Sequence, residues 1–595
     1  MTYNRSDPSE ILNNAVKLYL HNMRKEALEV LSVEKYIKET GGKFVESPDA
    51  SSVLKGFIAS IGLLEGMLSG SADSLAVIVE EFWETEKLAN NSPDKEWIGN
   101  RVSRGLSYML GGILQVFMGR YVKGGLNVAI SFKLVRDLEQ DVLAISSDSK
   151  DGYIRSLGLL VLSLMNFFAQ VLPASITSAG ELLGLGISKE KFYHYIEMCH
   201  KENGVFAYIA KLVLVQTTIN SKNFVFDHIS KDELSHCRTL INECLVLGPD
   251  SVIVNVINAS VCLGEGDIKG ASKTLSGEAI SRVISLPEWS NMELAVGYKL
   301  GVVHLCDFEF DKAQTAFKRA ADAIARRGRW HYLPFMRALE GLSYLAFVSV
   351  SGAPTNTLDE VRKTAMEIFA ETLLDRDLSD GAGVVLPGDH WGARSGYEQC
   401  ELLQGLSDKE LGEFISSKGP VSNVLYALLS VLYHFEKINR EKLEKFMHAS
   451  GFLESAKKYS TGIDQTDYKI KSVVGEYYRK IGEYGKSVAA FDDAIEEIDH
   501  AIENLDYKDK DTVLGFSLVL QGAALAASGD TETAKEVLAD LSDVLTESTD
   551  IIGGIVGSFS STAKSGKKSN LVKANGGEFD LVLNFRKNGL KQKLK

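Results

Sequence analysis

Histidines and cysteines are the residues of this 595-residue chain best suited to catalysis or metal binding. Asp389-His390-Trp391 could hold an imidazole as a general base, but no G-x-S-x-G turn supplies a nucleophile. No H-E-x-x-H occurs, and His194 and His200, six residues apart, do not share a helix face. The six cysteines form no C-x-x-C pair. We therefore expect a non-enzymatic protein with no catalytic residue, no metal and no cofactor.

Two glycine-containing stretches fall short of nucleotide-binding loops. Residues 565–569, SGKKS, lack the first glycine of a phosphate loop, and Lys568 replaces its Ser or Thr. Gly381 and Gly383 lack the third glycine of a dinucleotide loop. Neither stretch predicts nucleotide binding.

Composition and charge exclude several classes of protein. Hydrophobic residues make up 45% of the chain, which is enough to bury a large core. The formal net charge is −14, and an acidic chain is a poor general binder of nucleic acid because phosphates need clustered Lys and Arg. With only ten prolines in such a length, the chain favours helices, arranged as several domains or as one repeat array.

The amino terminus and the cysteines indicate a cytoplasmic protein that is not secreted. The opening MTYNRSDPSE has no secretory pattern, and Asp7 followed by Pro8 and Glu10 predicts a capped helix start. The cysteines are few and lie in apolar helical context, which predicts reduced, largely buried thiols. They are Cys199, Cys237, Cys244, Cys262, Cys306 and Cys400.

One pattern of small and aromatic residues recurs along the chain. The stretch VVGEYYRKIGEYGKSVAAFDDAI, residues 473–495, resembles the tetratricopeptide repeat, in which small residues let two antiparallel helices approach and aromatic residues fill the groove. Five further stretches fit the same frame and begin at Ala15, Gly112, Ala259, Gly301 and Gly522. The residues expected to pack the paired helices together are Gly112, Gly124, Ala271, Gly301, Ala313, Phe317, Gly475, Tyr478, Phe491, Ala494, Gly522 and Ala534.

This recurrence predicts an all-α fold, a tetratricopeptide-like α-solenoid of antiparallel helix pairs that can close into a compact superhelix. An ordinary helical bundle without repeats is the alternative. With ordinary repeat geometry, Glu476, Arg479 and Lys480 would line a concave face that binds protein partners. Plain surface residues are the alternative interpretation of these three.

Four regions follow from the distribution of these patterns. Residues 1–348 form an N-terminal helical repeat region, and residues 349–420 are expected to be a long loop or an insertion, because their glycines break helices. Residues 421–552 hold the C-terminal repeats. Residues 553–595 form a flexible basic tail that includes Lys567 and Lys568.

The apolar segment 157–172 is long enough to raise the question of a membrane span. It contains Ser163, Asn166 and Gln170, and Pro173 ends it, so a helix buried inside the solenoid fits better. The basic tail either folds back on the acidic body or makes weak contact with an anionic membrane or partner.

A second resemblance covers most of the chain. Asn166-x6-Pro173-x7-Glu181-x2-Gly184 is similar to a block of the tetratricopeptide-repeat-thirty-nine family, which includes the fungal inclusion-body-clearance proteins. The K-G-G-L block of that family matches Lys123, Gly124, Gly125 and Leu126. Residues 350–420 and the tail after 553 depart from the family pattern.

The resemblance implies a scaffold or adaptor that binds protein partners in clearance of inclusions, on lipid droplets or in protein turnover. The alternative is a membrane-associated scaffold, on the outer mitochondrial membrane or a lipid droplet, anchored by 157–172 or by the tail. The sequence names no partner and no oligomeric state.

Overall fold

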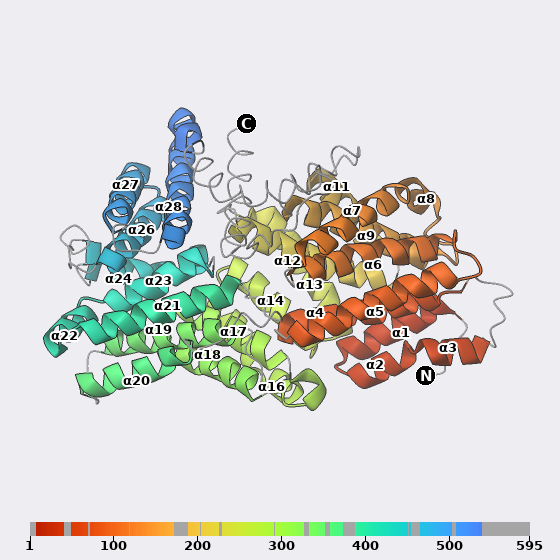
Figure 1. Cartoon of the computed structure of the whole chain (residues 1–595), viewed down its shortest axis with the longest axis horizontal. Helices are drawn as coiled ribbons and strands as arrows, with labels where there is room; N and C mark the ends of the chain where they lie inside the picture. Colours follow the sequence, from red (N-terminus) through yellow and green to blue (C-terminus); the bar gives the residue numbers. More distant parts are fainter. Residues whose placement is uncertain are drawn as a thin grey trace, which may run out of the picture.

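Helices form every regular element in the part of the chain that the computed structural model describes (Figure 1). No strand occurs among these residues, which confirms the all-α prediction and agrees with a helical solenoid. The described residues are 7–40, 49–69, 72–117, 120–171, 189–202, 204–224, 229–290, 292–326, 332–351, 357–372, 387–432, 434–449, 452–453, 464–501, 507–537 and 539.

Most helices pack against the next described helix along the chain. The N-terminal helices are α1 (Pro8–Leu20), α2 (Arg24–Val30), α3 (Val33–Thr40), α4 (Ser51–Ser69), α5 (Ala72–Asn91), α6 (Ile98–Phe117), α7 (Tyr121–Arg136), α8 (Glu139–Ala144), α9 (Gly152–Val171), α11 (Lys189–Lys201), α12 (Val205–Phe224) and α13 (Lys231–Leu247). The central helices are α14 (Val252–Gly264), α15 (Ile268–Ser276), α16 (Glu278–Ile284), η1 (Pro287–Trp289), α17 (Met292–Cys306) and α18 (Phe310–Ala325). The C-terminal helices are α19 (Leu333–Ser351), α20 (Leu358–Ala370), α21 (Pro387–Gly405), α22 (Asp408–Ser416), α23 (Gly419–Ser430), η2 (Phe435–Lys437), α24 (Arg440–Ala449), α26 (Asp464–Lys480), α27 (Tyr484–Ala501) and α28 (Tyr507–Ser528).

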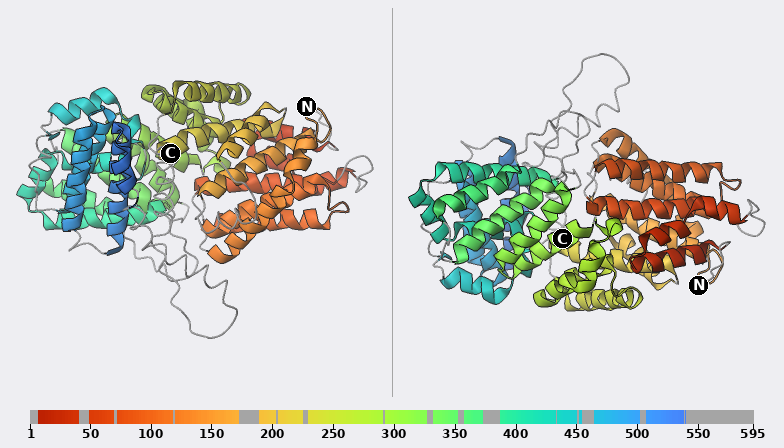
Figure 2. Two further views of the ribbon diagram at one scale, coloured as in Figure 1. Left: turned by 90° about the horizontal axis from the view of Figure 1, so that it is seen from above. Right: turned by 90° about the horizontal axis from the view of Figure 1, so that it is seen from below.

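The N-terminal and the C-terminal helices of the described chain lie at opposite ends of the molecule (Figure 1). Helices α1–α13 gather at one end of the long axis and α19–α28 at the other, and the two views of Figure 2 show the same division. The central helices join them, since α14 contacts both α12 and α17, and α17 also contacts α4. The N-terminal helices α1 and α4 therefore also pack against the central helices α14 and α17.

A left-handed residue recurs at the hairpin turns. Asn22, Gly266, Phe308, Gly482 and Gly529 have φ values of +62°, +77°, +58°, +84° and +90°. Each lies seven residues after the small residue that opens its repeat frame. In every case the next amide bonds to the carbonyl five residues back, as Glu483 N–H does to Tyr478 O at 2.9 Å. This is the Schellman arrangement, and it turns the chain in the same way at each hairpin.

Close helix approach accompanies these turns at the expected glycines. A Cβ on Gly301 would lie 2.4 Å from the Phe317 ring, and one on Gly475 would lie 2.8 Å from the Phe491 ring. A Cβ on Gly112 would lie 3.0 Å from the backbone oxygen of Gly124. The remaining packing residues predicted from sequence are buried, with the exception of Tyr478: they are Ala271, Ala313, Ala494, Gly522 and Ala534.

Tyr478 is only partly buried, contrary to its expected place in the groove. Tyr477, 1% exposed, takes the inner position on α26. The Lys486 ammonium lies 5.5 Å from the centroid of the Tyr478 ring, so this ring covers the outside of the hairpin.

Helices α19 to α23 contain most of the described residues of 349–420, so the prediction of a long loop was wrong there. Helix α21 contains Gly392 and Gly396, which we had expected to break a helix. A Cβ on Gly392 would lie 2.5 Å from the backbone nitrogen of Phe335, and one on Gly396 would lie 1.8 Å from Thr372 Oγ1. These glycines allow α21 to pack closely on its neighbours, and that packing offsets their low helix propensity. Residues 373–386 lie outside the described part.

The apolar segment 157–172 begins within α9, where residues 157–163 are buried. In the described part of the chain a different helix, α19, is long and apolar enough to cross a membrane by length and composition. Of its apolar window, 89% is buried inside the protein. A core helix of a helical protein passes the same test.

Candidate functional site

A half-enclosed pocket of about 60 Å³ lies where α26 and α28 meet α19, α21 and α23. Five helices therefore contribute to its walls, and they come from positions up to 174 residues apart, from Leu342 to Phe516. Its lining residues are Leu342, Trp391, Arg394, Ser395, Glu398, Gln399, Asn423, Tyr426, Ser430, Tyr468, Lys469 and Phe516.

Helix α21 supplies the largest share of the wall because its sequence has helical spacing. Trp391, Arg394 and Glu398 lie three and four residues apart, which places them on one face. Gly392 lies close to the backbone of α19 at Phe335, and Gly396 lies close to Thr372. These contacts fix the position of α21 against its neighbours. Gly392 and Gly396, whose helix propensity is low, thus help to position the pocket.

Glu398 is held between two cations. Its Oε2 lies 2.6 Å from Lys469 Nζ and its Oε1 lies 2.9 Å from Arg394 Nε. Burial raises the pKa of the carboxyl group, but the two cations outweigh burial and lower the pKa to about 2. Glu398 is therefore ionised at neutral pH and pairs with both cations.

Aromatic rings surround this charge cluster. Tyr426 packs edge-on against Tyr468 at 5.8 Å and against Phe516 at 6.1 Å between ring centroids. The Lys469 ammonium lies 5.7 Å from the Tyr468 centroid and 6.0 Å from the Tyr426 centroid. Burial is the main cause that raises the pKa of Tyr426 well above its ordinary value, and the neighbouring Tyr468 is the second cause. The Tyr426 hydroxyl therefore stays protonated. A cation among rings favours a ligand with a negative group and an apolar stem.

One buried acceptor in the pocket has no partner in the described part of the chain. Asn423 donates from Nδ2 to Gln399 Oε1 at 3.5 Å, but its Oδ1 is buried and unpaired there. A buried carbonyl without a donor costs roughly 1–3 kcal/mol. A ligand that brings an N–H or O–H group to Asn423 would remove that cost.

The chemistry of the pocket is suited to binding. Among the described side chains that line it there is no histidine and no cysteine, which are the usual ligands of zinc and the usual bases and nucleophiles. Trp391 of the Asp389-His390-Trp391 triplet lines the pocket, whereas the side chains of Asp389 and His390 lie outside the described residues.

The cysteines are buried and free, as predicted for reduced thiols. Burial raises the pKa of Cys237 to about 11 and that of Cys244 to about 12. Thiols with such values are almost entirely protonated at neutral pH and are poor nucleophiles.

The face predicted to bind partners is covered by the protein itself, so this prediction was wrong. Glu476 is fully buried and pairs with Arg479 at 2.5 Å, and Arg479 also reaches Glu436 at 2.5 Å. Lys480 Nζ donates to the backbone oxygens of residues 435, 436 and 438 at 3.2–3.3 Å. The segment around η2 packs over α26 and uses all three side chains, which a lone repeat frame does not reveal.

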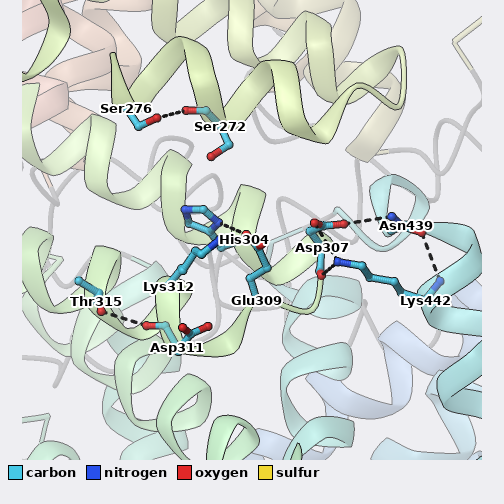
Figure 3. A network of polar contacts seen from close by, with 10 residues as sticks. All are labelled: Ser272, Ser276, His304, Asp307, Glu309, Asp311, Lys312, Thr315, Asn439 and Lys442. Atoms are coloured by element: carbon cyan, nitrogen blue, oxygen red, sulfur yellow. Dashed lines mark hydrogen bonds and ion pairs between the residues drawn. The ribbon is translucent and has the colours of Figure 1, made fainter. Parts of the chain in front are cut away.

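A second polar cluster joins α24 to the turn between α17 and α18 (Figure 3). Asn439 N–H donates to Cys306 O at 2.8 Å, and Asn439 Nδ2 donates to Asp307 Oδ1 at 3.0 Å. Lys442 Nζ lies 2.9 Å from Asp307 Oδ2 and donates to the backbone oxygen of Asp307 at 2.7 Å. These groups satisfy one another, so we interpret the cluster as a structural joint.

The residues of the second resemblance are spread over several places. Lys123 is exposed on α7, Gly125 is partly buried, and Asn166 is buried on α9, where its Nδ2 donates to Leu162 O at 2.8 Å. Three residues of the resemblance lie outside the described residues: Pro173, Glu181 and Gly184. The tail lysines Lys567 and Lys568 also lie outside them.

Sequence reasoning missed the pocket as a site. The stripe of Trp391, Arg394 and Glu398 on α21 was visible as a helical spacing, but the glycines around it had predicted a loop. Lys469 joins Glu398 from 71 residues away, and no local spacing signals that contact.

Comparison with known proteins adds no identity. No protein-family model matches the chain, and no curated protein matches it.

Proposed function

We propose that this protein is a non-enzymatic helical-repeat scaffold that binds protein partners and receives an acidic group of a partner in the pocket between α21 and α26. The observation that carries the proposal is a charged cluster, in which Lys469 and Arg394 pair with Glu398, inside aromatic walls and beside Asn423 Oδ1, which has no donor in the described chain. A lysine ammonium among apolar walls offers an anionic group of a partner a site for a charge-assisted hydrogen bond.

The size of the pocket favours the tip of a side chain over a large ligand. A volume of about 60 Å³ accommodates a carboxylate and the methylene next to it. The carboxylate of an Asp or Glu side chain, or of a carboxyl terminus, would lie beside Lys469. The backbone N–H of the same partner segment would supply the donor that Asn423 Oδ1 lacks in the described chain.

The resemblance to the tetratricopeptide-repeat-thirty-nine and inclusion-body-clearance proteins supports a biological setting for this scaffold. On that basis the partners belong to the clearance of protein inclusions, to lipid droplets or to protein turnover, in the cytoplasm. Stacked helix hairpins suit this role because they present long surfaces to peptides and helices.

The test compares two lysines on the same helix. Lys469→Met removes one of the two pocket cations, whereas Lys471→Met removes a lysine that pairs with Glu497 at 2.5 Å and does not line the pocket. The full-length wild type and both variants are used for affinity capture from cells, and the captured proteins are identified by mass spectrometry. We expect a set of partners that the wild type and Lys471→Met retain and that Lys469→Met loses.

Peptides from those partners then test the chemistry. A peptide with an essential Asp, Glu or carboxyl terminus should bind the wild type, and its amide form should bind at least about tenfold more weakly, because hydrogen bonds to charged groups contribute about 1.5–3 kcal/mol. Equal capture by all three proteins would place partner binding outside the pocket. Capture of nothing above background by the wild type would remove the support for a scaffold.

A membrane-associated scaffold is the alternative function. The buried positions of residues 157–163 favour the basic tail over α9 as its membrane contact. Pelleting with anionic liposomes, with and without residues 553–595, distinguishes the two segments. If liposome binding is lost when residues 553–595 are removed and also at high salt, the tail is an electrostatic tether. If binding survives the removal of the tail and high salt, another segment is inserted in the membrane.

A further inference from the structure

Two histidines and a glutamate converge at a place far from the pocket in sequence. Glu197 and His200 lie on α11 and His236 lies on α13, and one potential ligand atom of each lies within 4.8 Å of the other two. Glu197 Oε2 is 2.8 Å from His200 Nε2, and Glu197 Oε1 is 3.2 Å from His236 Nε2. The centroids of the two imidazoles are 5.8 Å apart. We propose that these three side chains bind one Zn²⁺ ion that ties α11 to α13.

The distances are close to those of a zinc site. Zinc binds imidazole nitrogen at about 2.0–2.1 Å and carboxylate oxygen at about 2.0–2.2 Å, so a tetrahedral site holds its ligand atoms about 3.3 Å apart. His200 Nε2 lies 2.8 Å from Glu197 Oε2, and His236 Nε2 lies 3.2 Å from the other carboxylate oxygen, Oε1. One ligand atom from each of the three residues lies within 4.8 Å of the other two. The His236 side chain is 44% exposed, so it has room to move until the three ligand atoms reach the spacing of a tetrahedral site.

The positions of the three residues suit a metal that enters from solvent. Glu197 and His200 are three residues apart on one helix face, and the His200 side chain is only 9% exposed, which fixes its orientation. The His236 side chain is 44% exposed, so an ion can reach the site and a water can occupy the fourth position.

Donor chemistry selects the class of metal. Two imidazole nitrogens and one carboxylate oxygen suit Zn²⁺ and its borderline neighbours, whereas Mg²⁺ and Ca²⁺ prefer oxygen ligands alone. Each imidazole would bind through Nε2 as a neutral ring that carries its proton on Nδ1. Lys201 lies 3.6 Å from Glu197 Oε2, but its side chain is 70% exposed and can turn into water when the ion binds.

The consequence of binding is mechanical. Helix α12 separates α11 from α13 along the chain, so an ion shared by the outer two helices clamps a three-helix unit. A ligand that binds the folded state and not the open state stabilises the folded state by mass action. Zinc should therefore slow the local opening of α11 and α13.

The test uses the full-length protein after removal of metal with a chelator and dialysis. Isothermal titration with ZnCl₂ should show one equivalent bound, and hydrogen–deuterium exchange in α11 and α13 should slow when zinc is present. His200→Asn and His236→Asn should each weaken binding by about tenfold or more. His194→Asn is the matched control, because His194 is an exposed histidine of the same helix that is not in the cluster, and it should bind zinc like the wild type.

Circular dichroism shows whether each variant retains the helical fold. Absence of zinc binding by the folded wild type overturns the proposal. Unchanged zinc binding by a folded His200→Asn/His236→Asn double variant also overturns it, because the ion would then lie elsewhere. Titration with MgCl₂ should show no comparable binding, and tighter binding of magnesium than of zinc would contradict the nitrogen ligands.

Discussion

Trp289 and Asn22, 267 residues apart, are joined by a hydrogen bond in which the indole Nε1–H donates to the backbone oxygen of Asn22 at 2.7 Å. The Tyr19 ring packs on the same indole, with 5.1 Å between centroids. Trp289 is 2% exposed, so its N–H needs a protein acceptor. The first hairpin is therefore closed onto the middle of the chain, whereas a simple solenoid makes contacts only between neighbouring repeats.

Replacement of Asn22 should loosen this closure, and alanine should loosen it more than glycine. Asn22 has φ +62°, its Nδ2 donates to Asp250 O at 2.9 Å, and its Oδ1 accepts from Val252 N–H at 3.3 Å. Asn22→Gly keeps the backbone and loses these bonds, at a cost of about 1–2 kcal/mol. Asn22→Ala adds about 1 kcal/mol for the left-handed backbone. Hydrogen–deuterium exchange in α1 and α14 should rise in that order; equal exchange in the two variants would contradict the argument from φ.

Gly301→Ala should destabilise the α17–α18 hairpin by about 1–3 kcal/mol, because the new Cβ would lie 2.4 Å from the Phe317 ring. Gly485→Ala is the matched control: no atom lies within 4 Å of its new Cβ, and alanine in a helix should stabilise by up to about 1 kcal/mol. Urea unfolding followed by circular dichroism gives the comparison. Phe317→Leu should recover part of the loss in the Gly301→Ala background, and no change in Gly301→Ala would show that the helices are not in close contact.

Much of the fold could be predicted because its determinants are local. A small residue, an aromatic residue and a turn residue at fixed spacing define each hairpin, and Gly301, Phe317 and Gly482 have the contacts or the backbone that the frame requires. The α21 region was mispredicted because Gly392 and Gly396 were judged by helix propensity alone. Tertiary packing decides there, since a side chain at either position would clash with α19 or with Thr372.

The candidate sites depend on contacts between distant segments, and a single sequence does not encode these in any local spacing. Lys469 meets Glu398 across 71 residues, and His236 meets Glu197 across 39. The burial of Glu476 depends in the same way on the segment around η2, which packs over α26 from 40 residues upstream. Local spacing therefore predicts the helix hairpins, but it does not predict which side chains of distant hairpins meet.

The pocket charge cluster should make stability depend on pH in acid. The two cations keep the pKa of Glu398 at about 2 against an ordinary 4.5, so its contribution is complete above about pH 4.5 and is lost as the pH falls towards 2. Glu398→Gln should destabilise the protein at pH 7 by about 3–5 kcal/mol, since it leaves Lys469 and Arg394 buried without an anion.

The difference between wild type and Glu398→Gln isolates this carboxyl from all others. In urea unfolding from pH 7 to pH 2 the difference should stay constant to about pH 4.5 and then shrink. A difference that does not change with pH would mean that Glu398 is not an ionised partner of the two cations.

Lys299 of α17 differs from Glu398 because it is a buried charged group for which the described chain provides no ion pair. Burial lowers its pKa from 10.5 to about 8, and Cys306 opposes this only weakly. Between pH 8 and 10.5 the unfolded chain binds the proton and the folded chain does not, so the penalty is complete below pH 8 and disappears as the pH rises through that range.

Lys299→Met should therefore stabilise the protein by about 1–3 kcal/mol at pH 7, because a methionine of similar length fills the same space without a charge. The gain should fall towards zero near pH 10.5, as the wild-type lysine becomes neutral in both states. Lys318→Met, which removes an exposed lysine of α18, should change stability by no more than about 0.5 kcal/mol at either pH. Urea unfolding of the three proteins at both pH values measures this. A loss of stability in Lys299→Met at pH 7 would show that the buried ammonium is well solvated by its surroundings, which is the reverse of what its position in the core implies.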